Sequence, residues 1–144
     1  MKPFRFLALV LAVLLLGIGG MTGAQAEEGI AQPLTDKPGD PANGKALAMA
    51  RSKGNCIACH WLPEATFPGN AGPNLYEAIR HNERSTAWIR QKIVNPKVDN
   101  PDTLMFTFYD STGKQNLLKA WEGKPVLEAQ EVEDVIAYLL SLRN

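Results

Sequence analysis

The sequence predicts an all-α fold, because helical signals recur along the chain and no convincing run of alternating strand residues appears. Asp40 followed by Pro41 marks a helix start, since aspartate caps free backbone amides and proline fits the first helical turn. Residues 128–142 carry the strongest signal, an apolar stripe at helical spacing. Its members are Val132, Val135, Ile136, Leu139 and Leu140.

The first 26 residues have the features of a secretory signal peptide. Lys2 and Arg5 precede an apolar run at 6–18, and Ala24–Ala26 resembles a cleavage site. A membrane anchor is the alternative, but the run is shorter than the ~20 residues that span a bilayer. Cleavage after Ala26 would leave a formal charge of −2, without the basic excess typical of nucleic-acid binding. The mature protein is expected in the periplasm, with no membrane span.

Residues 27–39 contain prolines and glycines with little periodic hydrophobicity, which predicts an extended arm, either a lead-in or a segment lying on a partner. Residues 40–144 are expected to form one domain. Its first helix is predicted over 42–53 and ended by Gly54. Gly44 lies inside this helix, where the lack of a side chain would permit a close helix crossing.

Three more helices are expected in the domain. The first covers Leu75–Arg80, and the second begins after a Ser85 cap and runs through Val94, where Asn95-Pro96 ends it. The last helix covers Glu128–Leu142. Acidic residues in its early turns, including Glu133 and Asp134, are interpreted as charges that favour the helix dipole.

Cys56-Ile57-Ala58-Cys59-His60 is the motif with the clearest chemistry. Cys-x-x-Cys-His is the attachment pattern of c-type haem, in which two thiols form thioethers to the porphyrin and the histidine becomes an axial iron ligand. The chain has only these two cysteines. We therefore expect one covalent haem c, held by Cys56 and Cys59 and coordinated by His60.

The cysteine pair has two alternative interpretations. A disulfide or thioredoxin-type dithiol leaves His60 without a role, and the chain lacks the βαβ pattern around such a pair. Half of a zinc site needs two further cysteine or histidine ligands, and only His81 remains.

A capped helix, the haem motif, a long irregular middle and a closing amphipathic helix resemble the class I cytochrome c fold, with helices packed around the haem. The resemblance implies that the first and last helices cross at Gly44, with Tyr138 packed nearby. It also implies that Pro73 offers its backbone carbonyl to His60. An ordinary Gly-Pro turn is the alternative for Pro73, and a core tyrosine is the alternative for Tyr138.

The sixth iron ligand has three candidates in the mature chain. Met49 lies too close to the haem motif in sequence to reach the opposite face, and His81 lies in a charged stretch typical of a solvated surface. Met105 is far enough downstream to close over the distal side. We expect His60/Met105 coordination, which raises the reduction potential because a thioether favours ferrous iron.

The runs around Pro73, Trp88–Arg90, Asn100–Met105 and Glu133–Leu139 resemble the SoxX family, over about residues 40–142. Members are the small monohaem cytochrome subunits of the sulfur-oxidising SoxAX complex. Many cytochromes follow the ligand methionine with proline, and here Phe106 follows instead. Arg90 is expected on a solvated face, with neutralisation of a haem propionate as the alternative.

The resemblance implies an electron-transfer subunit of an L-cysteine S-thiosulfotransferase complex in thiosulfate oxidation. Implied partners are a SoxA-like cytochrome, a soluble cytochrome acceptor and a carrier protein of the pathway. No catalytic residue is assigned to this chain. The alternatives are a free-standing electron-carrier cytochrome c and a haem-based ligand sensor with an open sixth site.

Overall fold

The computed structural model of the chain describes residues 29–81, 84–112, 119 and 122–143. The expected signal peptide lies outside these residues. Within them the regular elements are α-helices and short 3-10 helices, with no strand, and the predicted all-α class is confirmed. None of the helices in this described part is long and apolar enough to cross a membrane. In chain order they are α2 (Pro41–Met49), η1 (Cys56–Ala58), α3 (Leu75–His81), α4 (Thr86–Val94), η2 (Pro96–Val98) and α5 (Ala129–Ser141).

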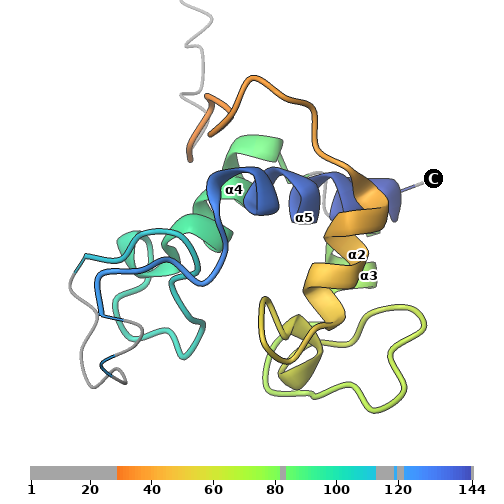
Figure 1. Cartoon of the computed structure of the whole chain (residues 1–144). Coiled ribbons are helices and arrows are strands. Elements are labelled where there is room, and N and C mark those ends of the chain that lie inside the picture. The colour runs from red at the N-terminus through yellow and green to blue at the C-terminus, as the bar shows by residue number, and fades with distance from the viewer. Residues whose placement is uncertain (1–28, 82–83, 113–118, 120–121, 144) are drawn as a thin grey trace, which may run out of the picture.

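Helix α5 is the element on which the others assemble. Its apolar stripe is buried as predicted, with Val132 and Val135 almost without solvent exposure. Helices α2, α3 and α4 all pack against it, and Figure 1 shows α2 and α4 meeting α5 at different points along its length. The irregular segments after α2 and after α4 extend from this helical layer as two separate lobes. The apolar faces of these few helices form one continuous core.

The predicted close crossing of the first and last helices occurs at Gly44. A Cβ added there would lie 1.9 Å from the backbone oxygen of Asp134, so no other residue fits without separating the helices. Tyr138 is buried one turn further along α5. The helix crossing expected at these two positions is therefore confirmed.

The predicted end of the first helix was wrong. Helix α2 ends at Met49, because Ala50 adopts an extended conformation with ψ of 120°. The chain then turns back on the helix, where the Gly54 N–H donates to the Leu47 carbonyl at 3.1 Å. Gly54 thus allows a close approach to α2 instead of ending it.

The remaining helices match their predicted positions. The Ser85 hydroxyl caps α4 by accepting the Trp88 N–H at 3.0 Å. Helix α4 ends at Val94, directly before Asn95-Pro96. Helix α5 begins one residue after Glu128, whose N–H donates to the carboxylate of Glu131 at 2.9 Å.

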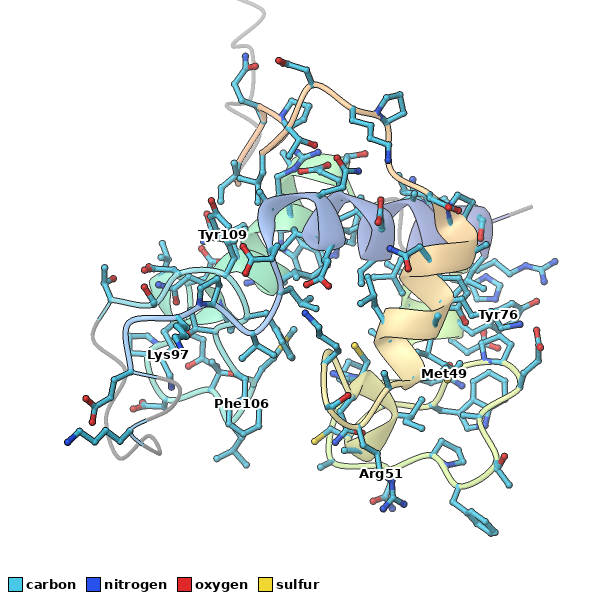
Figure 2. The ribbon with its side chains drawn as sticks, in the orientation of Figure 1. Met49, Arg51, Tyr76, Lys97, Phe106 and Tyr109 are labelled. Atoms are coloured by element: carbon cyan, nitrogen blue, oxygen red, sulfur yellow. The ribbon has the colours of Figure 1, made fainter. Side chains whose placement is uncertain are left out.

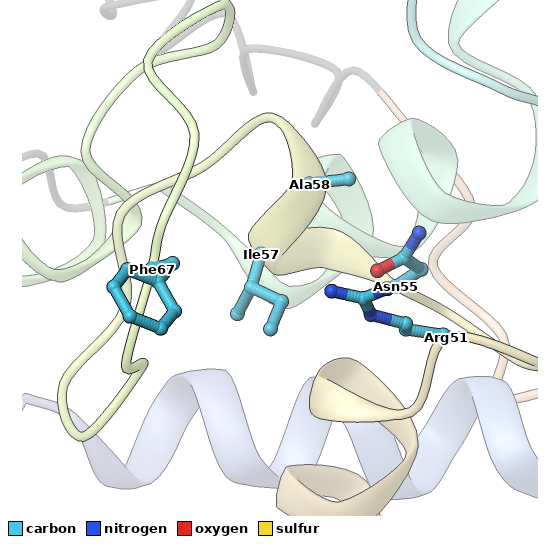
Figure 3. A pocket seen from close by; sticks show the side chains of 5 residues that line it. All are labelled: Arg51, Asn55, Ile57, Ala58 and Phe67. Carbon is cyan, nitrogen blue, oxygen red and sulfur yellow. The ribbon is translucent and has the colours of Figure 1, made fainter.

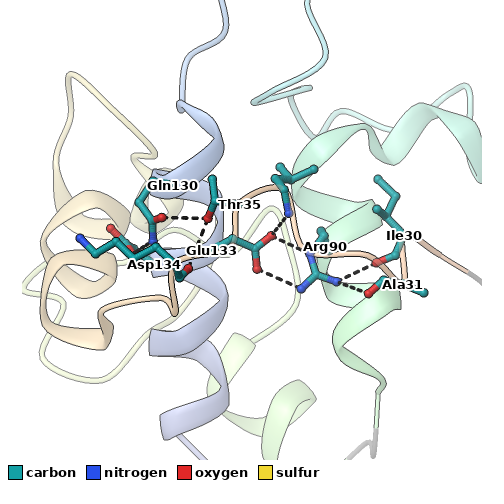
Figure 4. Close-up of polar contacts among 9 residues, drawn as sticks. Ile30, Ala31, Thr35, Arg90, Gln130, Glu133 and Asp134 are labelled. Atoms are coloured by element: carbon teal, nitrogen blue, oxygen red, sulfur yellow. Dashed lines mark hydrogen bonds and ion pairs between the residues drawn. The ribbon is translucent and has the colours of Figure 1, made fainter.

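The described part of the arm, residues 29–39, lies on α4 and α5 of its own chain. The Ile30 N–H donates to the Ala87 carbonyl at 3.1 Å, and the Thr35 hydroxyl donates to Gln130 at 2.8 Å. Figure 4 shows the Thr35 bond to Gln130 on α5 and the bonds from Arg90 on α4 to the carbonyls of Ile30 and Ala31. Ile30 and Leu34 also pack against the core, so this segment contributes to the domain's stability.

Arg90 is the anchor of this region, and its expected place on a solvated face was wrong. Only 3% of the residue is exposed, and its guanidinium pairs with Glu133 while donating to the Ile30 carbonyl at 2.7 Å. Burial of an arginine requires such a set of acceptors.

Candidate functional site

The Cys-x-x-Cys-His motif forms a single tight turn. Asn55 enters it with a left-handed φ of 46°, and η1 follows directly. The Cys59 and His60 N–H groups both donate to the Cys56 carbonyl, at 3.2 Å and 2.9 Å. One helical turn thus brings both thiols and the imidazole to the same short segment.

The loop after the motif folds back onto it. The Gly69 N–H donates to the Ile57 carbonyl at 2.7 Å, and the Gly72 N–H donates to the Cys59 carbonyl at 2.8 Å. This return brings Pro73 beside the histidine, where His60 Nδ1 lies 2.8 Å from the Pro73 carbonyl oxygen. The predicted bond between these two residues is confirmed.

The bond to Pro73 has a chemical consequence for His60. A carbonyl can only accept, so Nδ1 carries a proton, and in the neutral imidazole the lone pair is then on Nε2. The same bond fixes the ring orientation and makes the imidazole a better metal donor. His60 therefore has the tautomer that a metal-binding histidine needs.

Gly72 packs directly against the imidazole of His60. A Cβ at position 72 would lie 2.3 Å from Cε1 and 2.6 Å from Nδ1 of His60. The absence of a side chain thus gives the ring its space, while the neighbouring Pro73 holds it. The role of the proline was expected from the sequence, whereas that of this glycine was not.

The two cysteines are free thiols in different environments. Cys56 is half-buried and Cys59 is exposed. Burial raises the pKa of the Cys56 thiol to about 11, against a backbone hydrogen bond that lowers it. Within the residues described, no group of three or more histidine, cysteine, aspartate or glutamate side chains is arranged to hold a metal ion. The pair thus finds no zinc-site partners there.

Met105 belongs to the segment that follows α4 and η2. Figure 1 shows this segment on the other lobe. The Met105 side chain is half-buried and packs against the core. Its neighbours Leu104 and Phe106 are 92% and 71% exposed. The motif and Met105 thus stand on separate lobes that both extend from the α2–α5 layer.

The two rejected ligand candidates have other places in the fold. Met49 is half-buried at the end of α2 and packs against the core, and Figure 2 shows it above the turn that carries Arg51. His81 is exposed at the end of α3, where Nε2 lies 2.9 Å from the Glu77 carboxylate. The exposed position of His81 agrees with the solvated surface expected from the sequence.

A small open pocket of about 170 Å³ lies beside the motif turn. Its lining residues are Arg51, Asn55, Ile57, Ala58 and Phe67, as Figure 3 shows. Neither cysteine nor His60 contributes to it, so the pocket is not the place where the motif's chemistry would act.

Tyr138 contributes a polar atom that sequence analysis left without a role. Its hydroxyl is buried and has no hydrogen-bond partner among the described residues. Burial is the main cause that raises the pKa of Tyr138 above its usual value.

The residues present fit a c-type haem. The two thiols supply thioether sulfurs, and His60 offers a neutral nitrogen. The apolar porphyrin ring would need apolar side chains around it. Both lobes carry large apolar side chains that are exposed to solvent in the protein without haem. These are Trp61 and Phe67 on the motif's lobe and Val98, Leu104 and Phe106 on the lobe of Met105.

Comparisons with known proteins agree with this geometry. The family model described as cytochrome c matches residues 41–143. Among solved structures, the chain is similar to one described as the crystal structure of SoxXA from P. pantotrophus, with a TM-score of 0.72 and 32% sequence identity. That match covers 82% of this chain and 92% of the other. A search of curated proteins gives no match.

Proposed function

Since the chain belongs to the cytochrome c family and is a SoxX-like member of it, we propose that it is the electron-transfer subunit of a periplasmic SoxAX-like complex. Its partner would be a SoxA-like cytochrome, and the pathway would be thiosulfate oxidation. Electrons would leave to a soluble cytochrome. The observation that carries the proposal is the His60–Pro73 bond within a haem-attachment turn, because it prepares a nitrogen for iron.

The proposed site uses four residues of this chain. Cys56 and Cys59 would hold the haem c through thioethers, and His60 and Met105 would bind its iron. The bound haem supplies the iron that changes oxidation state. The soft neutral sulfur of Met105 stabilises the ferrous form, and the Pro73 carbonyl fixes the orientation of His60. Because His60 and Met105 would both stay bound, electron transfer would need no ligand exchange.

The cysteine count decides how the chemistry would be divided between the subunits. Cys56 and Cys59 are the only cysteines of the chain, and thioether formation uses both. No thiol then remains for covalent sulfur transfer. The bond between thiosulfate and the cysteine of the carrier protein would therefore be made on the SoxA-like partner, and this chain would accept the released electrons.

The pathway assignment is tested by thiosulfate-dependent reduction of the haem. The mature holoprotein is mixed with thiosulfate and a SoxA-like partner, with and without the carrier protein, and reduction is followed by absorbance. We expect reduction only when the partner is present. A free-standing electron carrier would remain alone during purification, and reduction that does not depend on the partner would contradict the proposal.

The ligand assignment is tested by comparing two methionines. Met105→Ala should abolish the sulfur-to-iron absorption band near the red end of the spectrum, and Met49→Ala should retain it. Mass spectrometry of the exported protein should also give one added haem and an N-terminus at Glu27. Fast carbon monoxide binding by the reduced wild-type protein would instead favour a ligand sensor with an open sixth site.

A further inference from the structure

The segment that carries Met105 is closed at its base by the end of α4. The Phe108 N–H donates to the Ile93 carbonyl and the Asp110 N–H donates to the Val94 carbonyl, each at 3.2 Å. The side-chain amide of Asn95 adds a bond to the Asp110 carboxylate at 2.8 Å. Residues 95–110, called here the distal loop, therefore leave α4 and return to it. These bonds fix the ends of the loop, and Met105 lies between them.

A lysine restrains the interior of the distal loop. Lys97 Nζ donates to the Thr103 carbonyl at 3.0 Å and to the Pro101 carbonyl at 3.4 Å. The Thr103 hydroxyl in turn accepts the Met105 N–H at 3.2 Å. A continuous set of bonds thus runs from Lys97 through Thr103 to the backbone of Met105. Figure 2 shows Lys97 and Phe106 on this same lobe.

The partners of Lys97 differ from those of the other hydrogen-bonded lysines in the described part of the chain. Lys45, Lys53 and Lys92 each pair with a carboxylate. Lys97 instead donates to two backbone carbonyls of one loop. Its ammonium group therefore restrains the backbone of the loop directly. Such bonds to a charged donor are stronger than those between neutral groups.

We propose that Lys97 is a positioning residue that holds Met105 over the iron by restraining Thr103. The inference rests on the proposed function, in which Met105 is the sixth ligand. A proline after the methionine would stiffen the backbone by fixing φ, but Phe106 occupies that position and is itself 71% exposed. The bonds from Lys97 supply the missing restraint.

The restraint can be measured through the equilibrium in which Met105 dissociates from the iron. Carbon monoxide binds ferrous haem only when the sixth position is free, so its binding rate reports the population of the dissociated form. The full mature holoprotein is compared with Lys97→Ala, Lys97→Arg and Thr103→Val. Lys124→Ala is the matched control, because Lys124 is an exposed lysine with no hydrogen bond among the described residues.

Because water can replace the lost partner at this exposed loop, loss of one such hydrogen bond is expected to change an equilibrium by about fivefold. We therefore expect carbon monoxide to bind about fivefold faster to Lys97→Ala and to Thr103→Val, with a sulfur-to-iron band that is lost at lower denaturant concentration. Lys97→Arg should stay near the wild type, because a guanidinium can also donate to carbonyls. Helical circular dichroism should be unchanged in all four variants.

Three results would overturn the proposal. A wild-type binding rate in Lys97→Ala would remove the role of the lysine, and an equal acceleration in Lys124→Ala would assign the effect to net charge. A wild-type rate in Met105→Ala would show that methionine is not the sixth ligand. Only this last result would also contradict the ligand assignment in the proposed function.

Discussion

Arg90 and Glu133 form a buried, two-pronged ion pair, with Nε 2.7 Å from Oε1 and Nη2 2.9 Å from Oε2. The two side chains are 4% and 8% exposed. The pair also reaches the arm, since Glu133 accepts the Leu34 N–H at 2.9 Å and Arg90 donates to the Ile30 carbonyl. One ion pair thus joins α4, α5 and the segment before α2.

Breaking this ion pair should be strongly destabilising, because the residue that remains is a buried charged group without its partner. We expect Arg90→Ala to lower the free energy of unfolding by about 3–5 kcal/mol. Lys45→Ala removes the solvent-exposed pair with Glu64 and should cost about 0–1 kcal/mol. Urea unfolding of the holoprotein measures both. Equal losses in the two variants would mean that the buried pair contributes no more than a surface contact.

The sequence predicted the helices well and their polar partners poorly. The spacing of Val132 and Val135 identified the buried face of α5, since periodicity reports which side chains share a face. Glu133 and Asp134 were interpreted as charges at a helix start, yet both are buried and bind other segments. Nothing in their spacing reveals that Arg90 or the arm will reach them, because such contacts depend on how distant segments meet.

In the candidate site, too, local features were predicted from the sequence and contacts between distant segments were not. A short motif with fixed spacing predicted that Cys56 and His60 share one turn, and the family resemblance placed Pro73 beside His60. The restraint by Lys97 and the space left by Gly72 were not predicted. Both depend on loop conformations in which a lysine meets carbonyls, or a ring meets a glycine, and composition gives no signal for either.

Asp134 should make stability depend on acid pH. Burial alone would raise the pKa of Asp134, but hydrogen bonds from the Asp40 N–H and from the Gln130 and Asn43 side chains outweigh it, and the pKa is lowered. A depressed pKa means that the carboxylate stabilises the fold above its unfolded pKa, near 3.9. This contribution is lost as pH falls through the lower, folded value.

The difference in stability between wild type and Asp134→Asn should therefore be constant from about pH 7 to 5 and shrink below about pH 4. Urea midpoints at several pH values measure it, and subtracting the variant removes the effect of other carboxylates. A difference that stays the same down to pH 3 would show that Asp134 titrates alike in the folded and unfolded states.

Gly44→Ala should destabilise the protein although alanine is the better helix former. In a solvent-exposed helix, replacing glycine by alanine would raise the free energy of unfolding by about 1 kcal/mol. Here the new Cβ would lie 1.9 Å from the Asp134 carbonyl oxygen, so α2 and α5 must separate. We expect a net loss of about 1–3 kcal/mol, as for other overpacked sites.

The control for this crossing is Ala46→Gly, at an exposed position of the same helix. It should lose about 1 kcal/mol through helix propensity alone. Thermal unfolding of both holoproteins shows whether each substitution raises or lowers stability. If Gly44→Ala raised the melting temperature, the helices would not be in contact at this position.

Gly72→Ala should disturb the iron ligand without touching the helical core. Its Cβ would lie 2.3 Å from Cε1 of His60, so the ring must rotate and weaken its bond to Pro73. Overpacking of this kind costs about 1–3 kcal/mol. A weaker bond also makes the imidazole a poorer donor to iron, because the carbonyl no longer supports its Nδ1–H.

The control is Ala71→Ser, at the exposed neighbour, which should leave the bond between His60 and Pro73 and the iron ligation by His60 unchanged. The reduction potential and the paramagnetically shifted proton signals of His60 should therefore differ from wild type in Gly72→Ala alone. Identical shifted signals in Gly72→Ala and wild type would mean that His60 binds iron in an orientation that does not depend on this contact.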